Sequence, residues 1–430
     1  MRHRPVLNAL FAASLAAFAA TPHAARAEVA ASPAAVPMPD GFAPEKLARI
    51  DAVMQRYVDD GEVAGIVALV LKDGEPVYQG TFGWADREAG RRMREDTIFR
   101  IASQTKALTS VAVLMLMEDG RLALDDPAGR YIASFRDTRV AVRGEDGSTR
   151  TVPAERPITI RDLLTHTAGI SYGREETIAA QYEAKGLGPA AGNGWYTADK
   201  REGTCDTMER LGTLPFVAQP GADFVYGYNT DVLGCIVERA SGMPLDRFVR
   251  ERIAAPLGMD DTQFFLPQAQ RARLATLYGS GGDGRYVRAP EGASGQGHYV
   301  DGPRMNFSGG AGLLSTARDY ARFLEMIRRG GELDGVRLLA PRTVALMRTN
   351  QVGDRYSEDG LGFGLGFQTV ERYGANGMET PGAYGWSGAY GSYYRVDPAL
   401  GLVTVMMIQL MPNRTNVRDT FANMVYAAME

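Results

Sequence analysis

The stretch from Phe99 to Gly120 constrains the fold of this chain more than any other part of its sequence. Residues Val111 to Met117 are apolar on every side of a helix, and Gly120 is a typical helix stop just beyond them. A helix without a polar face is stable only where other elements cover it all round. The sequence therefore predicts a buried central helix enclosed by further layers of structure.

Ser103 and Lys106 lie near the start of this predicted helix. Residues three positions apart share one helical face, so the hydroxyl and the amine are close enough to hydrogen-bond. A nucleophilic serine needs a base beside it, and a lysine on an apolar helix must find partners or lose its charge. No other Ser-x-x-Lys occurs in the chain. The alternative, a surface serine beside a solvated lysine, fits the apolar run poorly.

Strand signals lie near both ends of the chain, and helices and long loops dominate between them. The elements expected at the two ends are a helix at about 44–59, strands at 66–71 and 77–84 around an Asp-Gly turn, strands at 388–397 and 402–409, and a helix at about 417–428. The clearest helical pieces of the middle are 158–166 and 231–241, and the loops at 173–206 and 278–303 are the least readable parts.

This order of elements indicates an α/β plus all-α architecture. The sheet domain is expected from 43–121 and 305–430, because both ends of the chain contribute strands. A mostly helical insertion is expected at 122–304, with a binding cleft at the junction of the two parts. Long loops of the insertion are expected to line that cleft.

The first 27 residues have the three parts of a secretory signal peptide. These parts are a charged start with Arg2 and Arg4, an apolar stretch at 6–20, and the small-x-small site Ala25-Arg26-Ala27. Residues 28–42 are rich in Ala and Pro and are expected to form a flexible leader. Because no apolar stretch is long enough to span a bilayer, we expect an exported, soluble protein, periplasmic or secreted, without a stable membrane anchor.

Signal cleavage makes the chain more acidic. Cleavage near Ala27 removes three arginines and no acid, so the net charge of −4 for the whole chain becomes more negative; cleavage after Ala19 is an alternative. A mildly acidic surface argues against nucleic acid and anionic lipid as partners.

Cys205 and Cys235 are the only cysteines, and their spacing matches no metal site. An exported compartment permits a disulfide between them. However, Cys235 lies in the apolar run 232–237, where a small buried core residue is expected. We therefore favour a core role for Cys235 over a disulfide.

A second serine motif, Gly169-Ile-Ser171-Tyr-Gly173, has the Gly-x-Ser-x-Gly pattern of α/β-hydrolases. That nucleophile elbow needs a strand before it and a helix after it, whereas here a helix precedes the motif and polar loop follows. After signal cleavage only His166 and His298 remain as bases for a Ser-His-Asp triad, and His166 sits at a helix end, where capping or a core hydrogen bond is expected. We therefore interpret the Ser171 motif as a decoy.

The phenol of Tyr226 is the better candidate for a second base. It lies in a turn that enters a helix, where side chains can point into a cleft. Tyr228 is its rival, and for either residue the alternative is a half-buried aromatic ring whose hydroxyl binds a neighbour.

A series of motifs in consistent order resembles the serine β-lactamase-related superfamily, and within it class C β-lactamases and family VIII carboxylesterases. The motifs are Ser103-Gln-Thr-Lys106, Ile158 to Gly169, Tyr226 with Asp231-Val-Leu-Gly234, Pro256-Leu-Gly-Met259, Gly312 to Asp319, and Trp386-Ser-Gly388 before Val396-Asp-Pro398. The likeness covers roughly residues 45 to 428. It implies a β-lactamase/transpeptidase-like fold, with an antiparallel sheet flanked by helices and a helical insertion.

The resemblance implies roles for three residues. Ser103 is similar to the nucleophile, Lys106 to the partner that receives or relays its proton, and Tyr226 to the tyrosine base. The chain departs from the Tyr-x-Asn pattern at this point, because Tyr228 holds the third position and the nearest asparagine is Asn229. The assignment of Tyr226 rests instead on its distance from the Asp231 motif, as in esterase-like members.

The third family motif also departs from the β-lactamase pattern, because Trp386-Ser387-Gly388 stands where β-lactamases have Lys-Thr-Gly. A lysine there offers positive charge to a substrate carboxylate, which an indole cannot. Trp386 offers apolar area and one N–H donor, which suits an uncharged ester. Gly388 would let substrate approach the strand, and the resemblance implies an oxyanion hole from the N–H groups of Ser103 and Ala389.

We therefore predict an exported serine hydrolase that cleaves small carboxylic esters through an acyl-serine intermediate, with Tyr228, Trp386, Ser387 and Gly388 contacting substrate. Its alternatives are β-lactamase or D-amino-acid peptidase activity on the same scaffold, and a catalytically inactive binding protein of the cell envelope. No metal or organic cofactor is needed for the predicted reaction. The oligomeric state and the natural ester are left open.

Overall fold

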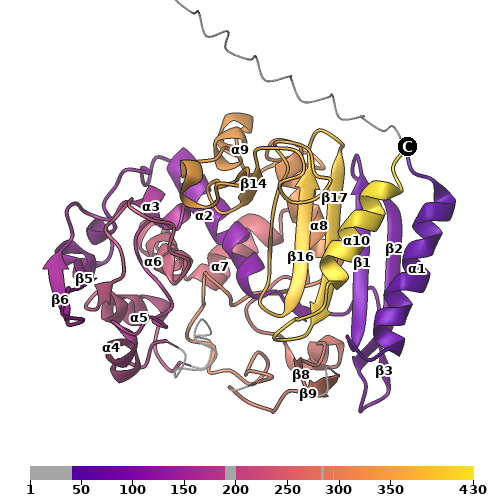
Figure 1. Cartoon of the computed structure of the whole chain (residues 1–430), viewed down its shortest axis with the longest axis horizontal. Coiled ribbons are helices and arrows are strands. Elements are labelled where there is room, and N and C mark those ends of the chain that lie inside the picture. The colour runs from indigo at the N-terminus through magenta and orange to yellow at the C-terminus, as the bar shows by residue number, and fades with distance from the viewer. Residues whose placement is uncertain (1–40, 189–199, 282–284, 294) are drawn as a thin grey trace, which may run out of the picture. The chain divides into compact units, whose positions relative to one another are not determined.

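An eight-stranded antiparallel sheet organises the structure, a computed structural model that describes residues 41–188, 200–281, 285–293 and 295–430 (Figure 1). The strands in spatial order are β13 (Leu361–Phe363), β14 (Gln368–Val370), β15 (Tyr384–Ser387), β16 (Gly391–Asp397), β17 (Leu402–Gln409), β1 (Gly65–Lys72), β2 (Glu75–Asp86) and β3 (Arg91–Arg92). Strand β17 pairs with β1, so late and early segments meet in the middle of the sheet. The predicted sheet of both chain ends is confirmed.

The central strand β1 is apolar on both faces because helices cover both sides of the sheet. Ile66, Ala68 and Val70 pack into one core with helices α1 (Pro44–Asp59) and α10 (Val417–Ala427). The alternate residues Val67 and Leu69 face the other core, which contains α2 (Thr105–Glu118) and α8 (Ala317–Arg328). Strand period and continuous hydrophobicity together produce this two-sided burial.

Helix α2 is the buried central helix that the sequence predicts. Every residue from Thr105 to Leu116 is buried, and α2 packs against α6 (Asn229–Ser241). A single turn of 3-10 helix, Ala102–Gln104, precedes it. The helix therefore shares one hydrophobic core with strands of the sheet and with α6.

The segment between residues 122 and 304 carries several helices, but it is not only helical. Its α-helices are α3 (Ile160–Leu164), α4 (Ala179–Ala184), α5 (Thr204–Leu211), α6 and α7 (Leu245–Val249). It also contains a three-stranded sheet of β5 (Arg139–Arg143), β6 (Thr149–Pro153) and β7 (Pro215–Phe216), which the sequence does not predict. Only two residues of β5 and none of β6 are buried, so hydrophobic alternation is too weak to reveal these strands.

Short elements complete the fold. They are β4 (Phe99–Arg100) paired with β10 (Leu314–Ser315), β8 (Tyr278–Ser280) with β9 (Tyr286–Arg288), β11 (Glu332–Leu333) with β12 (Val336–Arg337), and α9 (Pro341–Met347). The described residues from 41 to 430 form one compact unit, and the predicted division into a sheet domain and an insertion domain stays a prediction. No helix among the described residues has the length and apolar character needed to cross a bilayer. The predicted signal peptide lies outside the described residues.

A disulfide joins Cys205 on α5 to Cys235 on α6, so the preference for an unpaired core cysteine is wrong. Cys235 is completely buried, as its apolar neighbours indicate. The pairing arises because α5 packs on α6, a contact between segments 30 residues apart that local sequence does not reveal.

Candidate active site

Ser103 sits on a tight turn between a strand and a helix. Strand β4 enters the turn, Ala102 adopts the left-handed conformation with φ 44°, and α2 leaves it. A non-glycine residue in this region stores backbone strain, which is typical of functional sites. The side chain of Ser103 is nearly buried but lines a cleft. The strand-turn-helix arrangement of a nucleophile elbow is thus present at Ser103.

Lys106 is 2% exposed and makes three hydrogen bonds. Its Nζ lies 3.3 Å from Ser103 Oγ, 3.1 Å from the hydroxyl of Tyr172 and 2.8 Å from the carbonyl oxygen of Gly310. An ammonium has three donors, so these three acceptors satisfy it fully. The contact with Ser103 is the one expected from their spacing along the helix.

Tyr172 is the contact of Lys106 that sequence reasoning missed. It is buried at the cleft wall, and burial raises the pKa of its hydroxyl well above the ordinary value, with Tyr226 and Asp231 adding to the rise. It therefore stays a neutral phenol in the resting site. The one signal in the sequence is its place inside the Ser171 motif, where the glycines draw attention to the serine instead.

Tyr226 lies against Lys106 through its ring. Lys106 Nζ is 4.6 Å from the centre of the Tyr226 ring, and the indole N–H of Trp386 donates to the Tyr226 hydroxyl at 3.1 Å. The ring of His166 packs beside Tyr226, with centres 4.6 Å apart. Tyr226 is half-buried and lines the same cleft as Ser103. The structure thus gathers Ser103, Lys106 and Tyr226 at one place.

Tyr228 is in a different position from its rival. It is 1% exposed, its hydroxyl accepts the N–H of Gly188 at 3.0 Å, and burial raises its pKa. Its ring packs against Tyr172, behind the residues that line the cleft. The predicted contact of Tyr228 with substrate is therefore not supported, because this side chain, just before α6, packs on Tyr172 in the core.

The end of β15 and the residues after it form the cleft wall beside the turn that carries Ser103. Trp386, Ser387, Gly388 and Ala389 all line the cleft. A Cβ on Gly388 would lie 2.6 Å from the carbonyl oxygen of Ile101, so glycine is required here for the strand to approach the backbone before Ser103. Close backbone packing is thus a further reason for this glycine, and the predicted approach of substrate to the strand stays a prediction. The N–H of Ala389 has no acceptor among the described residues, as an oxyanion donor requires.

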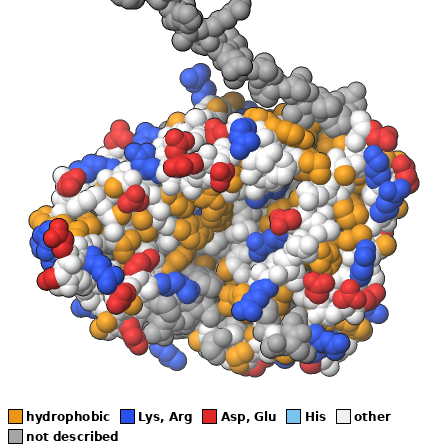
Figure 2. Space-filling view, in the orientation of Figure 1, with side chains coloured by type: hydrophobic (Ala, Val, Ile, Leu, Met, Phe, Trp, Pro, Cys, Tyr) orange, Lys and Arg blue, Asp and Glu red, His pale blue; other side chains and the backbone are white. Residues whose placement is uncertain are grey.

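The cleft has a volume of about 500 Å³ and is open to solvent. Beyond the residues already named, its lining includes Arg174, Met411, Pro412, Asn413 and Arg418. Figure 2 shows hydrophobic side chains gathered in a hollow of this face, between the helical part and the sheet. Of the described residues in the two loops expected to line the cleft, only Arg174 does so.

Ser171 makes a different set of contacts. It is 1% exposed, its hydroxyl donates to Glu175 Oε2 at 2.5 Å, and it accepts the N–H of Gly173. Residues 165–173 contain no strand and no helix follows at once. His166 Nδ1 pairs with the side-chain amide of Asn229, and burial together with the charge of Lys106 lowers the pKa of His166 well below its usual range. The interpretation of this motif as a decoy agrees with these contacts.

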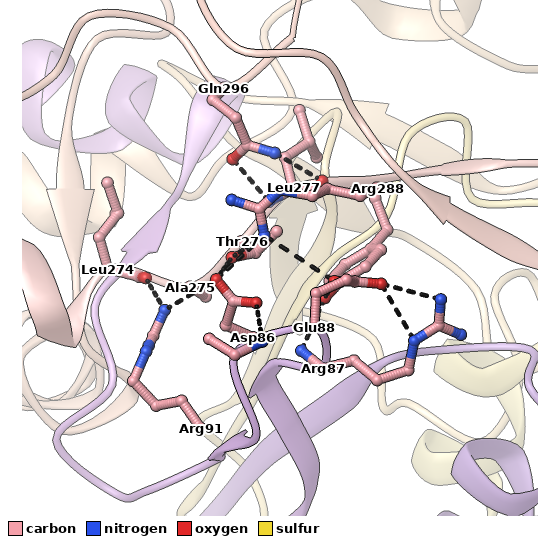
Figure 3. Close-up of polar contacts among 12 residues, drawn as sticks. Asp86, Arg87, Glu88, Arg91, Leu274, Ala275, Thr276, Leu277, Arg288 and Gln296 are labelled. Carbon is pink, nitrogen blue, oxygen red and sulfur yellow. Dashed lines mark hydrogen bonds and ion pairs between the residues drawn. The ribbon is translucent and has the colours of Figure 1, made fainter.

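A second polar cluster, centred on Asp86 and Arg288, fixes the segment that follows residue 273 (Figure 3). Asp86 accepts hydrogen bonds from Thr276 at 2.8 Å and from Arg288 at 3.0 Å. Gln296 bonds both backbone groups of Leu277 through its amide. The acids and bases of this cluster satisfy one another, so it has the character of a structural anchor.

Arg100 connects this anchor to the turn that carries Ser103. Its guanidinium donates to the carbonyl oxygens of Ala275 at 2.6 Å and Gln296 at 2.9 Å. Its backbone groups pair with the side chain of Gln409 on β17. The chain is therefore held on both sides three residues before the nucleophile.

Among the described residues, no group of three or more His, Cys, Asp or Glu side chains is placed to hold a metal ion. The polar groups of the cleft include hydroxyls, phenols, an indole, a side-chain amide and the guanidinium groups of Arg174 and Arg418, with the amine of Lys106 beside Ser103. Among them are the groups of acyl transfer to serine, in which a nucleophile, a proton acceptor and an oxyanion site are needed.

Comparison with known proteins gives consistent results. The family model described as Beta-lactamase matches residues 50–428. Esterase EstB of Burkholderia gladioli is 36% identical over 376 residues, which cover 84% of this chain and 89% of the esterase. A putative D-alanyl-D-alanine carboxypeptidase of Escherichia coli O157:H7 is 30% identical over 397 residues, covering 85% and 83%. The solved structure "EstCE1, a hydrolase with promiscuous acyltransferase activity" has a TM-score of 0.74 at 27% identity, covering 89% of this chain and 99% of its own.

The fold, the site and these relatives define a serine hydrolase of the esterase type with a β-lactamase/transpeptidase-like fold. The chain belongs to the β-lactamase family. The resemblance inferred from the motifs and the predicted fold class are both confirmed.

Proposed function

We propose that this protein hydrolyses small carboxylic esters through an acyl-enzyme formed on Ser103. The observation that carries the proposal is the Ser103 hydroxyl, 3.3 Å from Lys106 Nζ, in a cleft that the end of β15 also lines. A serine with a nitrogen base at this distance has the geometry of an activated nucleophile.

In the acylation step, Ser103 Oγ attacks the carbonyl carbon of the ester and gives up its proton. The pair formed by Lys106, 3.3 Å from the hydroxyl, and Tyr226, whose ring lies 4.6 Å from Lys106 Nζ in the same cleft, takes up or relays that proton. The N–H groups of Ser103 and Ala389 bind the oxyanion. When the C–O bond of the ester breaks, the leaving alkoxide takes up the proton and departs as an alcohol.

In the deacylation step, water replaces the alcohol. The same basic groups take a proton from water as its oxygen attacks the acyl carbon, and the proton returns to Ser103 Oγ as the acid leaves. Each cycle consumes one ester and one water and releases one alcohol and one acid. No redox change occurs, so the residues of this chain are sufficient for the reaction.

Trp386 favours esters over β-lactams as substrates. Its indole packs on Tyr226 and Phe363 and donates to the Tyr226 hydroxyl, so the position supplies an apolar wall and no charge. A β-lactam carboxylate would lack the ammonium partner that a lysine gives. The similarity to EstB, an esterase, and to EstCE1, a hydrolase, supports the same choice.

The second candidate is peptidase or β-lactamase activity on the same scaffold. The observation in its favour is the similarity to the putative D-alanyl-D-alanine carboxypeptidase over most of both chains. The same nucleophile, base and oxyanion donors would serve an amide, and only the recognition of the leaving group would differ.

We also propose that the protein is exported. The support is the signal-like composition of residues 1–27 together with the disulfide between Cys205 and Cys235, a bond typical of oxidising compartments. Mass spectrometry of the protein secreted from its native host would test this. A mature N-terminus near residue 28 is expected, and an intact Met1 in the native protein contradicts export by cleavage.

The substrate proposal is tested by comparing turnover of p-nitrophenyl butyrate with turnover of a chromogenic cephalosporin by the same preparation. Ester cleavage that exceeds cephalosporin cleavage in kcat/KM is expected. Cephalosporin turnover without ester cleavage would reverse the order of the two candidates.

A further inference from the structure

A buried carboxylate, that of Asp231, lies behind the Lys106 side chain. Asp231 is the third residue of α6 and is 1% exposed. Its Oδ1 accepts the hydroxyl of Ser308 at 2.5 Å and the N–H of Gly310 at 3.1 Å. Its Oδ2 has no hydrogen-bond partner in the part of the chain that the structure describes. Burial of an acid at this depth is costly unless a positive charge lies near it.

Gly310 connects this carboxylate to Lys106. Its N–H binds Asp231, and its carbonyl oxygen accepts the ammonium of Lys106 at 2.8 Å. A Cβ at position 310 would lie 2.5 Å from Asp231 Oδ2, so the acid packs directly on this residue. One glycine thus separates the buried acid from the proposed base.

We propose that Asp231 is the positioning residue of Lys106: its buried negative charge, acting across Gly310, holds the Lys106 ammonium in place beside Ser103. The proposal rests on the proposed function in that Ser103 is the nucleophile. It assigns a role to a residue that touches neither substrate nor the reacting atoms.

The electrostatics of the two groups agree with this role. Burial raises the pKa of Asp231, and the positive charge of Lys106 opposes that rise, so Lys106 favours the ionised form of the acid. Asp231 also contributes to the raised pKa of Tyr172. The titratable or charged groups that surround the pair are Tyr172, His166, Tyr226, Tyr228 and Arg174.

The substitution Asp231→Asn separates charge from shape. Its side-chain carbonyl can still accept the Ser308 hydroxyl and the Gly310 N–H, while the negative charge is gone. Without that charge, the phenols whose pKa Asp231 raises, Tyr172 and Tyr228, lose their protons more easily. The labelling rate depends on pH through the titration of groups near Ser103. Removing a nearby negative charge lowers the pKa of such a group by about one unit, so the part of the pH profile that it controls moves to lower pH by the same amount.

The readout is the rate at which a fluorophosphonate labels the protein, measured against pH. Labelling follows Ser103 reactivity and does not depend on which substrate the enzyme turns over. If the wild type is labelled but cleaves no ester, the proposed function fails while this inference is still tested. The expected result is a profile for Asp231→Asn displaced to lower pH by about one unit.

Asp319→Asn is the matched control. Asp319 is the third residue of α8, is also buried, and accepts hydrogen bonds from the Asp261 N–H and the Thr262 hydroxyl, but it lies outside the cleft. Its loss should leave the labelling profile in place. An equal shift in Asp319→Asn would show a general effect of removing a buried acid and would overturn the proposal.

A purely structural role for Asp231 gives a different result. The variant would then melt at a lower temperature while its labelling profile stays at the wild-type pH, and that outcome overturns the proposal. If Asp231→Asn does not fold, the Ser308→Ala variant tests the proposal instead. Loss of the Ser308 hydroxyl removes a hydrogen bond that favours the ionised form of Asp231, so its negative charge is weakened while the carboxyl group stays in place. A smaller shift in the same direction is expected for Ser308→Ala, and a folded Ser308→Ala protein with an unmoved profile contradicts the role.

Discussion

Ser103 and Ser171 are two nearly buried serines, each in a motif known from serine hydrolases, and their surroundings differ in every feature that chemistry needs. Ser103 follows a strand and a strained residue, opens a helix and has an amine 3.3 Å away. Ser171 lies in irregular backbone and donates its proton to the carboxylate of Glu175. The hydrogen bond to Glu175 fixes the Ser171 hydroxyl as a donor, and Ser171 therefore has a carboxylate in place of the amine that lies beside Ser103.

The difference teaches that the backbone conformation around a serine, more than the sequence motif that contains it, decides its reactivity. The chain has the consensus of a nucleophile elbow at Ser171 but the geometry of one at Ser103. The glycines of the Ser171 motif serve packing instead, since a Cβ on Gly173 would lie 2.4 Å from the ring of Tyr182.

The largest expected effect separates the two serines directly. Ser103→Ala should lower kcat/KM for p-nitrophenyl butyrate by about 10⁴-fold or more, because the attacking atom is removed. Ser171→Ala should keep activity within a few-fold and lose about 1 kcal/mol of unfolding free energy from its hydrogen bonds. Activity assays with urea unfolding of both variants measure this. An inactive but folded Ser171→Ala enzyme would reverse the comparison.

The next effect concerns the base that only Ser103 has. Lys106→Met keeps the length of the side chain but removes the amine, so kcat/KM should fall by about 10³-fold. Lys185→Met, at an exposed lysine, is the control and should retain full activity. Circular dichroism establishes that both variants are folded. Activity of Lys106→Met within tenfold of wild type would remove the reason for choosing Ser103.

For the three tyrosines near Lys106, the loss of kcat on substitution by phenylalanine should follow their access to Ser103. Tyr226→Phe should cost about 10²-fold to 10³-fold in kcat, Tyr172→Phe less, and Tyr228→Phe least, because Tyr228 bonds Gly188 behind the wall. Steady-state kinetics of the three variants establishes the ranking. A greater loss in Tyr228→Phe than in Tyr226→Phe would move the second base by two positions.

The smallest expected effect concerns Trp386, in the cleft wall at the end of β15. Trp386→Phe keeps an apolar ring but loses the N–H that bonds the Tyr226 hydroxyl, a hydrogen bond worth about 1 kcal/mol, so kcat/KM should fall by about tenfold at most. Trp84→Phe on β2, away from the cleft, is the matched control and should not change it. Equal kinetics in the two variants would contradict a role of the indole in placing Tyr226.

Local spacing predicts some of this structure well. The pairing of Ser103 with Lys106 follows from helical geometry alone, and the two-sided burial of β1 follows from its continuous apolar run. Contacts between distant segments are beyond such reasoning. Tyr172 reaches Lys106 across 66 residues, and Cys205 meets Cys235 because two helices pack together. Neither contact leaves a periodic signal in the sequence.

Strand β15 and Gly388 are a second case in which local sequence does not predict a contact between distant segments. A single strand is expected over 388–397, whereas the structure ends β15 at Ser387, turns at Gly388 and starts β16 at Gly391. The turn exists because the strand end packs on the backbone before Ser103, a close approach that involves two remote parts of the chain. The cleft wall could therefore be assigned by resemblance but not by periodicity.

The most direct test of the central claim is to treat the folded protein with a fluorophosphonate, digest it and locate the added mass by tandem mass spectrometry. We predict one adduct, on the peptide that contains Ser103. An adduct on Ser171, or a folded and unlabelled protein, would contradict the claim that Ser103 is the nucleophile.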